Sequence, residues 1–114
     1  MAKVEHFEIP ADDVERAKAF YGGVFDFQFD DWDEDTVMIK PGGEDSIGGD
    51  IHKRSAIPHP TVVITVDDLD ETMAAVIANG GEQVGQVMPL GETARYAYFR
   101  DSEGNIVGIY DSRA

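Results

Sequence analysis

The sequence predicts an α+β protein assembled from two copies of a βαβββ module. When the chain is compared with itself, residues 6–19 align with residues 61–74, and each copy reads as a strand, an Asp-Asp pair and an amphipathic helix. Three short strand candidates, separated by turn residues, follow each helix. One duplicated unit therefore accounts for almost the whole chain of 114 residues.

Each predicted helix begins at one of two aspartate pairs, Asp12-Asp13 and Asp67-Asp68. A carboxylate at a helix start accepts hydrogen bonds from free backbone amides and opposes the positive end of the helix dipole. Apolar residues then recur at helical spacing in both copies. The helices are expected to end at glycine, at or just beyond residues 22–23 in the first copy and at residues 80–81 in the second.

The strands that follow each helix define the two modules. They are expected at Phe25–Phe29, Thr36–Ile39 and Ile47–His52 in the first copy, and at Glu82–Met88, Ala94–Arg100 and Ile106–Tyr110 in the second. The stretch Lys53–Pro60 contains two prolines and is interpreted as a linker. The first module then covers about residues 1–53, the linker about 54–60 and the second module about 61–114. The acidic stretch Asp30–Asp35 is expected to be a solvated loop.

Composition excludes several classes of function. The chain contains no cysteine, which rules out disulfides, thiolate metal sites and cysteine nucleophiles. With 23 acidic and 9 basic residues, its net charge of -14 would repel nucleic acid and anionic membranes, so neither is expected as a partner. No apolar run could span a bilayer and the N-terminus lacks signal-peptide features, which predicts a cytoplasmic protein. The acidity is typical of a halophilic source, with a cation-binding patch or general solubility as the alternatives.

Two motifs accompany the duplication. They are Arg16-Ala17-x-x-Phe20-Tyr21 in the first helix and Asp101-Ser102-Glu103-Gly104-Asn105 before the last strand. Together they resemble the vicinal oxygen chelate superfamily of glyoxalases, bleomycin-resistance proteins and dioxygenases, and the resemblance covers nearly the whole chain. It implies a curved mixed sheet around a cavity for substrate and a divalent metal. Because the family also includes epimerases and metal-free antibiotic-binding proteins, the fold does not select the reaction.

The resemblance implies four metal-ligand positions. They are a His or Gln on the first strand, a Glu on the fourth, a His on the fifth and a Glu on the eighth. His6 matches the first, whereas Thr61 and Gly108 occupy the fifth-strand and eighth-strand positions. By comparison with Gly108, the fourth-strand position is expected at Gly48 or Gly49, depending on the register. Because threonine and glycine offer neither imidazole nor carboxylate, no cofactor is expected.

Strand alternation indicates which side chains face the implied cavity. On the first strand, the apolar Phe7 and Ile9 are expected to pack under the helix, which leaves His6 and Glu8 facing the cavity. These two are the candidate catalytic residues. His6 is expected either to hydrogen-bond Glu8 or Thr61 in a purely structural role, or to transfer protons and bind substrate with Glu8 tuning it.

Other polar and aromatic residues complete the expected site. The ligand-binding cavity is expected to include Asp50, Thr61, Val63, Tyr96, Tyr98, Gly108 and Tyr110. The tyrosines either stack on an aromatic ligand or are core residues with their hydroxyls at the rim. Asp50 or His52 converging on His6 and Glu8 would rebuild a divalent metal site, which is the alternative to a metal-free centre. His52 and His59 flank the linker and are otherwise expected to be exposed.

Three functions are compatible with these residues. The first is metal-free binding of a small, hydrophobic or aromatic molecule in the cavity. The second is a lyase-type or isomerase-type enzyme in which His6 and Glu8 transfer protons, with or without a rebuilt metal site. The third is an interaction module without a small ligand. A homodimer is expected under each, because the family usually dimerises and a short two-module chain leaves sheet edges to cover.

Overall fold

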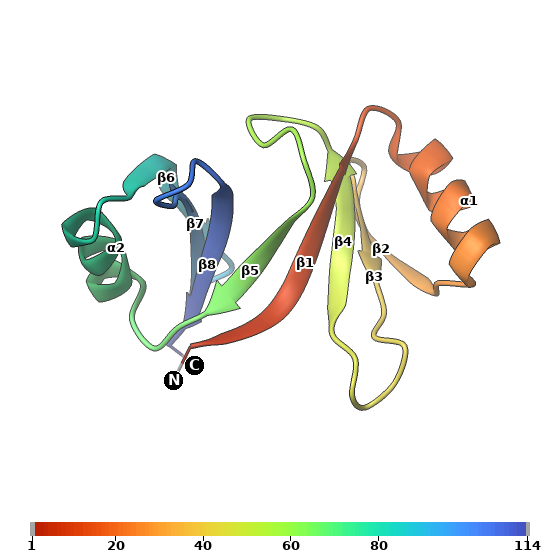
Figure 1. Ribbon diagram of the computed structural model, residues 1–114. Helices are drawn as coiled ribbons and strands as arrows, with labels where there is room; N and C mark the ends of the chain where they lie inside the picture. The colour runs from red at the N-terminus through yellow and green to blue at the C-terminus, as the bar shows by residue number, and fades with distance from the viewer. Residues whose placement is uncertain (1, 114) are drawn as a thin grey trace. The chain divides into compact units, whose positions relative to one another are not determined.

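The computed structural model describes residues 2–113, which form two compact units. One unit comprises residues 6–61, and the other comprises residues 62–113 with residues 2–5. The elements drawn in Figure 1 are β1 (Lys3–Ala11), α1 (Val14–Phe25), β2 (Phe29–Asp33), β3 (Thr36–Ile39), β4 (Gly48–Lys53), β5 (Thr61–Thr65), α2 (Leu69–Ala78), β6 (Glu82–Leu90), β7 (Ala94–Arg100) and β8 (Ile106–Ser112). Their order is βαβββ twice, which confirms the predicted fold class.

In the first unit the strands lie in the order β2-β3-β4-β1. β1 and β4 pair in parallel, whereas β3 is antiparallel to both of its neighbours. Helix α1 lies along one face of this sheet (Figure 1). The buried core beneath it consists of Ala11, Val37, Ile39 and Ile51. Phe7 and Ile9 pack against this core, as the alternation along the first strand predicts.

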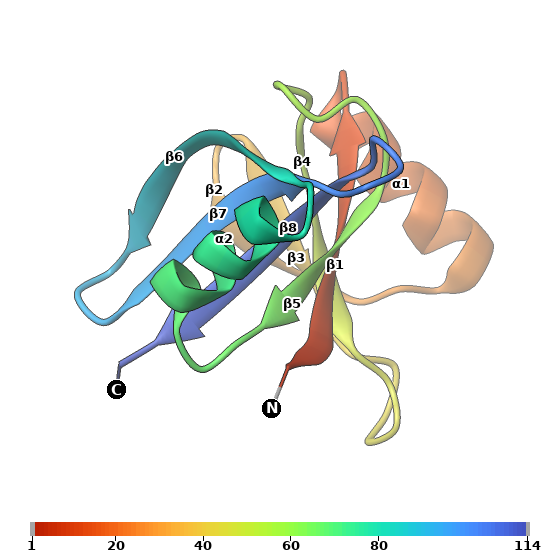
Figure 2. The same cartoon turned by 60° about the vertical axis from the view of Figure 1, so that its left-hand side comes forward.

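The second unit repeats this arrangement with the strand order β5-β8-β7-β6. β5 and β8 pair in parallel, and the other pairs are antiparallel. Helix α2 covers one face of these strands (Figure 2), over a buried core of Leu69, Met73, Ala97 and Ile109. In each module the helix therefore buries one face of the sheet, which leaves the other face for functional side chains.

Both helices begin at the predicted aspartate pairs. The Asp13 carboxylate accepts a hydrogen bond from the Arg16 amide at 3.0 Å, and the Asp68 carboxylate accepts one from the Glu71 amide at 3.1 Å. Helix α1 continues past the expected glycine pair and ends before Asp26, which has a left-handed backbone (φ 60). Helix α2 ends before Asn79, as the following glycine pair predicts.

The prediction for the second strand is wrong. Phe25 is the last residue of α1, and β2 begins only at Phe29, so that β2 includes much of the acidic stretch expected to be a loop. β2 is the edge strand of its sheet and its acidic residues are exposed, so their carboxylates stay in water while the backbone pairs with β3. Only residues 34–35 form the turn between these strands.

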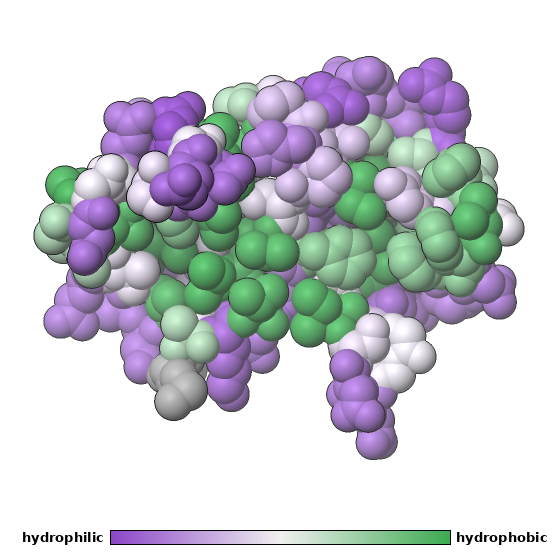
Figure 3. Space-filling model, in the orientation of Figure 1, coloured by the Kyte–Doolittle hydropathy of each residue, from purple (hydrophilic) through white to green (hydrophobic). Residues whose placement is uncertain are grey.

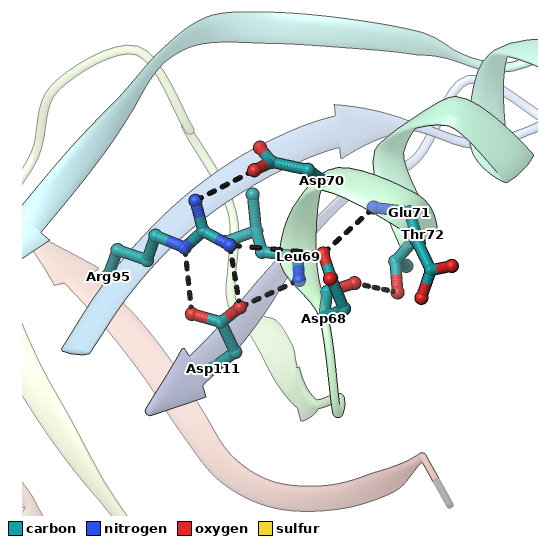
Figure 4. A network of polar contacts seen from close by, with 7 residues as sticks. All are labelled: Asp68, Leu69, Asp70, Glu71, Thr72, Arg95 and Asp111. Carbon is teal, nitrogen blue, oxygen red and sulfur yellow. Dashed lines mark hydrogen bonds and ion pairs between the residues drawn. The ribbon is translucent and has the colours of Figure 1, made fainter. Parts of the chain in front are cut away.

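The buried carboxylate of Asp111 links the start of α2 to the sheet of the second unit through hydrogen bonds (Figure 4). Asp111 is 1% exposed, accepts a hydrogen bond from the Leu69 amide at 2.7 Å and accepts two from the Arg95 guanidinium at 2.9 Å. Arg95 also donates to Asp70 at 3.0 Å. The hydrogen bonds from Arg95, and secondarily the one from Leu69, hold the pKa of Asp111 below its usual range despite its burial.

The surface carries both hydrophilic and apolar residues. On the face drawn in Figure 3, areas of hydrophilic residues lie beside areas of apolar ones. The exposed apolar side chains include Phe20, Val24 and Phe25 of α1. Within the described part of the chain, neither helix has the length and hydrophobicity required to traverse a lipid bilayer.

Candidate functional site

One face of the β1–β4 pair carries four polar side chains. The parallel register sets His6 opposite Gly48, Glu8 opposite Asp50 and Pro10 opposite His52. Because successive side chains alternate between the faces of a sheet, these positions share one face, whereas the intervening apolar residues pack beneath α1. We call His6, Glu8, Asp50 and His52 the first-module cluster. All four belong to a single compact unit.

Asp50 is the centre of this cluster. Its carboxylate is buried, with 7% of the residue exposed, and contacts two imidazoles. Oδ2 lies 2.7 Å from Nε2 of His6, and Oδ1 lies 2.7 Å from Nδ1 of His52. A carboxylate accepts hydrogen bonds, so each ring donates through the nitrogen that faces Asp50. Nδ1 of His6 and Nε2 of His52 are the nitrogens that remain for other partners.

The electrostatics of the cluster favour an ionised Asp50 carboxylate beside a protonated His52. Burial alone raises the pKa of Asp50, but the hydrogen bonds from His52 and then His6 outweigh burial, so the pKa lies below its ordinary value. The hydrogen bond to Asp50 raises the pKa of His52 above its ordinary value, against the opposing effect of burial. Asp50 therefore orients both rings and stabilises a proton on His52.

Three residues of the cluster also have the donor types of a metal site. One ligand atom each from His6, Glu8 and Asp50 lies within 4.8 Å of the others. Imidazole nitrogen and carboxylate oxygen bind first-row divalent metals at about 2.0–2.2 Å, which places donors on one ion up to about 4.4 Å apart. The three side chains therefore need only small adjustments to share a cation.

The prediction that His52 is exposed is wrong. Its side chain is only 20% exposed and contacts Asp50, whereas His59 is exposed as predicted. Its spacing from Asp50 could have predicted this position. Residues two apart on a strand share a face, so His52 lies on the same face as Asp50. The hydrogen bond that the structure gives His6 goes to Asp50, a partner that the sequence suggested only for a rebuilt metal site.

Comparison with known proteins identifies the family. The model of the Glyoxalase/Bleomycin resistance protein/Dioxygenase superfamily matches residues 3–109. The chain belongs to this superfamily. A glyoxylase-like domain-containing protein from Didymella fabae is 35% identical over 117 residues, which cover 94% of this chain and 91% of the relative.

Solved structures share the fold of this chain. A superfamily member from Vibrio splendidus has a TM-score of 0.71 and 13% identity, and the match covers 98% of this chain and 100% of that one. A variant of Streptomyces coelicolor methylmalonyl-CoA epimerase in complex with 2-nitronate-propionyl-CoA has a TM-score of 0.67 and 14% identity, over 98% and 95% of the two chains. At these identities the likeness concerns the fold alone.

The register corrects one expected ligand position of the superfamily. Gly108 on β8 lies opposite Val63 on β5, and Val63 corresponds to Glu8 in the internal repeat. Since Glu8 lies opposite Asp50, the first-module counterpart of Gly108 is Asp50, rather than Gly48 or Gly49. Of the four ligand positions that the resemblance implies, the first-strand and fourth-strand ones therefore fall on His6 and Asp50.

The second module does not complete the superfamily's four-ligand set. Thr61 offers no imidazole, and Gly108 offers no side chain at all. The space above Gly108 is also tight, because a β-carbon there would lie 3.1 Å from Cγ2 of Val63 and 3.2 Å from Cε1 of Tyr98. A glutamate at this position would have to displace both neighbours. The residues present therefore do not fit the standard metal centre.

The remaining predicted site residues gather within the second unit. Tyr96 lies opposite Tyr110 and Tyr98 lies opposite Gly108 in the β7–β8 register. The rings of Tyr96 and Tyr98 meet edge to face with their centroids 6.0 Å apart. The structure thus sorts the predicted residues into two groups, a polar cluster in the first module and an aromatic group around Gly108 in the second.

Proposed function

We propose that this superfamily member is an enzyme of the lyase or isomerase class that moves a proton on a small carbonyl compound at the first-module cluster. The observation that carries the proposal is the buried carboxylate of Asp50, which contacts two imidazoles at 2.7 Å. A strand face that served only to pack would not need this polar group, since burying a carboxylate is costly unless it is paired.

His52 is the proton carrier in this proposal. Asp50 holds its Nδ1, which fixes the ring and leaves Nε2 for the substrate, and the carboxylate stabilises the imidazolium that forms. An imidazole removes a carbon-bound proton at neutral pH only when a neighbouring carbonyl acidifies that proton, which is why we propose a carbonyl compound. His6 and Glu8 share the face and would bind and orient the molecule. An epimerase with the same fold is consistent with chemistry of this class.

The test is hydrogen exchange on candidate substrates in D₂O. Aryl and alkyl hydroxyketones, 2-oxo acids and acyl thioesters are incubated with the protein, and deuterium incorporation is measured by mass spectrometry. His52→Gln is expected to slow the exchange by about 10²- to 10⁴-fold, the usual contribution of a positioned acid or base. His59→Gln is the matched control, because His59 is exposed and its ring hydrogen-bonds a backbone carbonyl in its own loop. Equal exchange rates in the two variants would contradict the role of His52.

A second candidate function is supported by the aromatic group of the second module. Tyr96, Tyr98 and Tyr110 occupy neighbouring positions on β7 and β8, and tyrosines arranged in this way suit an aromatic ligand. The protein would then bind a small aromatic molecule without converting it. Thermal stabilisation by members of an aromatic panel, without deuterium incorporation or turnover, would favour this function over the enzyme.

A further inference from the structure

We propose that α1 is a contact surface for a second copy of this chain, with the α1 helices of the two copies packed antiparallel about a two-fold axis. The surface, which we call the α1 patch, consists of six exposed residues, Arg16, Phe20, Gly23, Val24, Phe25 and Asp26. The inference goes beyond the proposed function, because no residue of the patch belongs to the first-module cluster. It also differs from assembly through sheet edges, which is what the sequence predicts.

The duplicated fold offers α2 as a comparison for α1. Helix α2 buries Leu69 and Met73, whereas no residue of α1 is buried. The three large apolar side chains of the patch are instead 57–59% exposed, and apolar residues gather over α1 at the right of Figure 3. Among the residues of α2, all of which the structure describes, Ile77 is the one large apolar side chain that is exposed in this way. The apolar face of α1 therefore lacks the cover that its counterpart has.

The aromatic part of the patch is held in place before a partner binds. The Phe20 ring meets Tyr21 edge to face with the centroids 5.3 Å apart, and Phe25 stacks on Phe27 at 5.5 Å. Rings that are already fixed by neighbours lose little conformational entropy on association, which favours binding. Aromatic residues and arginine are also the types that are enriched in the centres of protein interfaces.

The charges of the patch favour a second copy over another partner. Three other arginines of the chain pair with carboxylates, whereas neither Arg16 nor Asp26 forms an ion pair within residues 2–113. Arg16 lies five positions before Tyr21 and Asp26 lies five positions after it. A two-fold axis at Tyr21 therefore brings Arg16 of each copy to Asp26 of the other, and it sets the helix dipoles in opposition.

Small residues allow the two helices to approach each other. Ala19 and Gly23 are both exposed and lie one helical turn apart on α1. A β-carbon added at Gly23 would meet no atom within 4 Å, so the chain itself leaves this space empty. Under the same two-fold axis, Ala19 of one copy faces Gly23 of the other. The Phe20 ring of each copy then packs beside the space that Gly23 of the other leaves.

The contact is expected to be weak and to strengthen with salt. The three large apolar side chains of the patch expose roughly 300 Å² per copy, which places their contact at the low end of interface sizes. Each copy carries a net charge of -14, and the repulsion between copies is screened as the ionic strength rises. We therefore expect monomers in dilute salt and dimers in concentrated KCl.

The test is sedimentation velocity of the full chain over a range of protein concentrations, in about 0.1 M and about 2 M KCl. The dissociation constant of the wild-type dimer is expected to be at least about tenfold lower at the higher salt. Gly23→Gln should preserve the helix, since glutamine is a good helix former with free space at this position, and raise the constant at least about tenfold by blocking the contact. Ile77→Gln changes the exposed apolar residue of α2 and is expected to dimerise like the wild type.

Two charge reversals test the antiparallel arrangement in about 0.5 M KCl, where charge pairs in contact are still felt. Arg16→Glu and Asp26→Lys are each expected to weaken the dimer, because each sets like charges against each other across the contact. An equimolar mixture of the two variants is expected to form a heterodimer more tightly than either forms a homodimer, since opposite charges then meet at both ends. A thermal melt of each variant verifies that it is folded.

Three results would overturn the inference. Wild-type protein that stays monomeric at both salt concentrations would show that a second copy does not cover the α1 patch. A dimer that Gly23→Gln leaves as tight as the wild type would be joined through another surface, such as the sheet edges. A mixture of the two charge variants that associates no better than its components would contradict the contact between Arg16 and Asp26.

Discussion

Replacing Asp111 with asparagine is expected to lower the free energy of unfolding by about 2–3 kcal/mol. Removing one member of a buried ion pair costs about 3–5 kcal/mol, and we place this substitution lower because Arg95 is partly exposed and keeps its contact with Asp70. The asparagine keeps the shape of the side chain but can no longer accept from both the Leu69 amide and the full guanidinium fork. Urea unfolding followed by circular dichroism measures the difference.

A control variant and the pH dependence test whether the lost ion pair is what destabilises Asp111→Asn. Asp70→Asn removes an exposed partner of the same arginine and is expected to cost less than about 1 kcal/mol. Because the pKa of Asp111 is lowered by folding, its contribution is complete above the unfolded pKa of about 3.9 and is lost as the pH falls through the folded pKa. The gap between the wild type and Asp111→Asn should therefore narrow in acid. A gap that widens in acid would contradict this assignment.

Replacing Asp50 with asparagine is expected to reduce proton exchange by about 10³- to 10⁴-fold while preserving the fold. The amide donates through its nitrogen, so one of the two imidazoles must accept instead of donate and is held in the wrong tautomer. In a catalytic Ser-His-Asp triad, the same change costs about 10⁴-fold for this reason. The rate is measured on the best probe of the D₂O assay, and the melting temperature is measured in parallel.

Asp35→Asn is the matched control for this substitution. Asp35 is an exposed aspartate in the turn between β2 and β3, so its replacement should leave both the exchange rate and the melting temperature unchanged. An Asp50→Asn variant with the exchange rate of the wild type would show that Asp50 has no part in orienting the imidazoles.

The duplicated fold was predictable because its signals are local. The aspartate caps, the helical spacing of apolar residues and the alternation along the first strand each depend on only a few neighbouring residues. β2 was missed for the opposite reason. An exposed edge strand tolerates consecutive acidic residues, so its composition resembles that of a loop, and only its pairing with β3 reveals it.

The site was predictable only in part. Alternation along one strand placed His6 and Glu8 on the face opposite the helix, and the structure confirms that Phe7 and Ile9 pack beneath α1. The role of Asp50 depends on the register between β1 and β4, whose paired residues are more than 40 positions apart in the chain. A shift of one residue would turn the other face of β4 toward His6, and nothing in the local sequence sets this register.

The most direct test of the first-module cluster is the ¹⁵N spectrum of the histidine rings in the metal-free protein at a pH where they are neutral. We predict that His52 carries its proton on Nδ1 and His6 on Nε2, because each donates to Asp50 through that nitrogen. Asp50→Asn should abolish this difference between the two rings. His6 and His52 spectra that match the exposed His59 in the wild type would contradict the central role of Asp50.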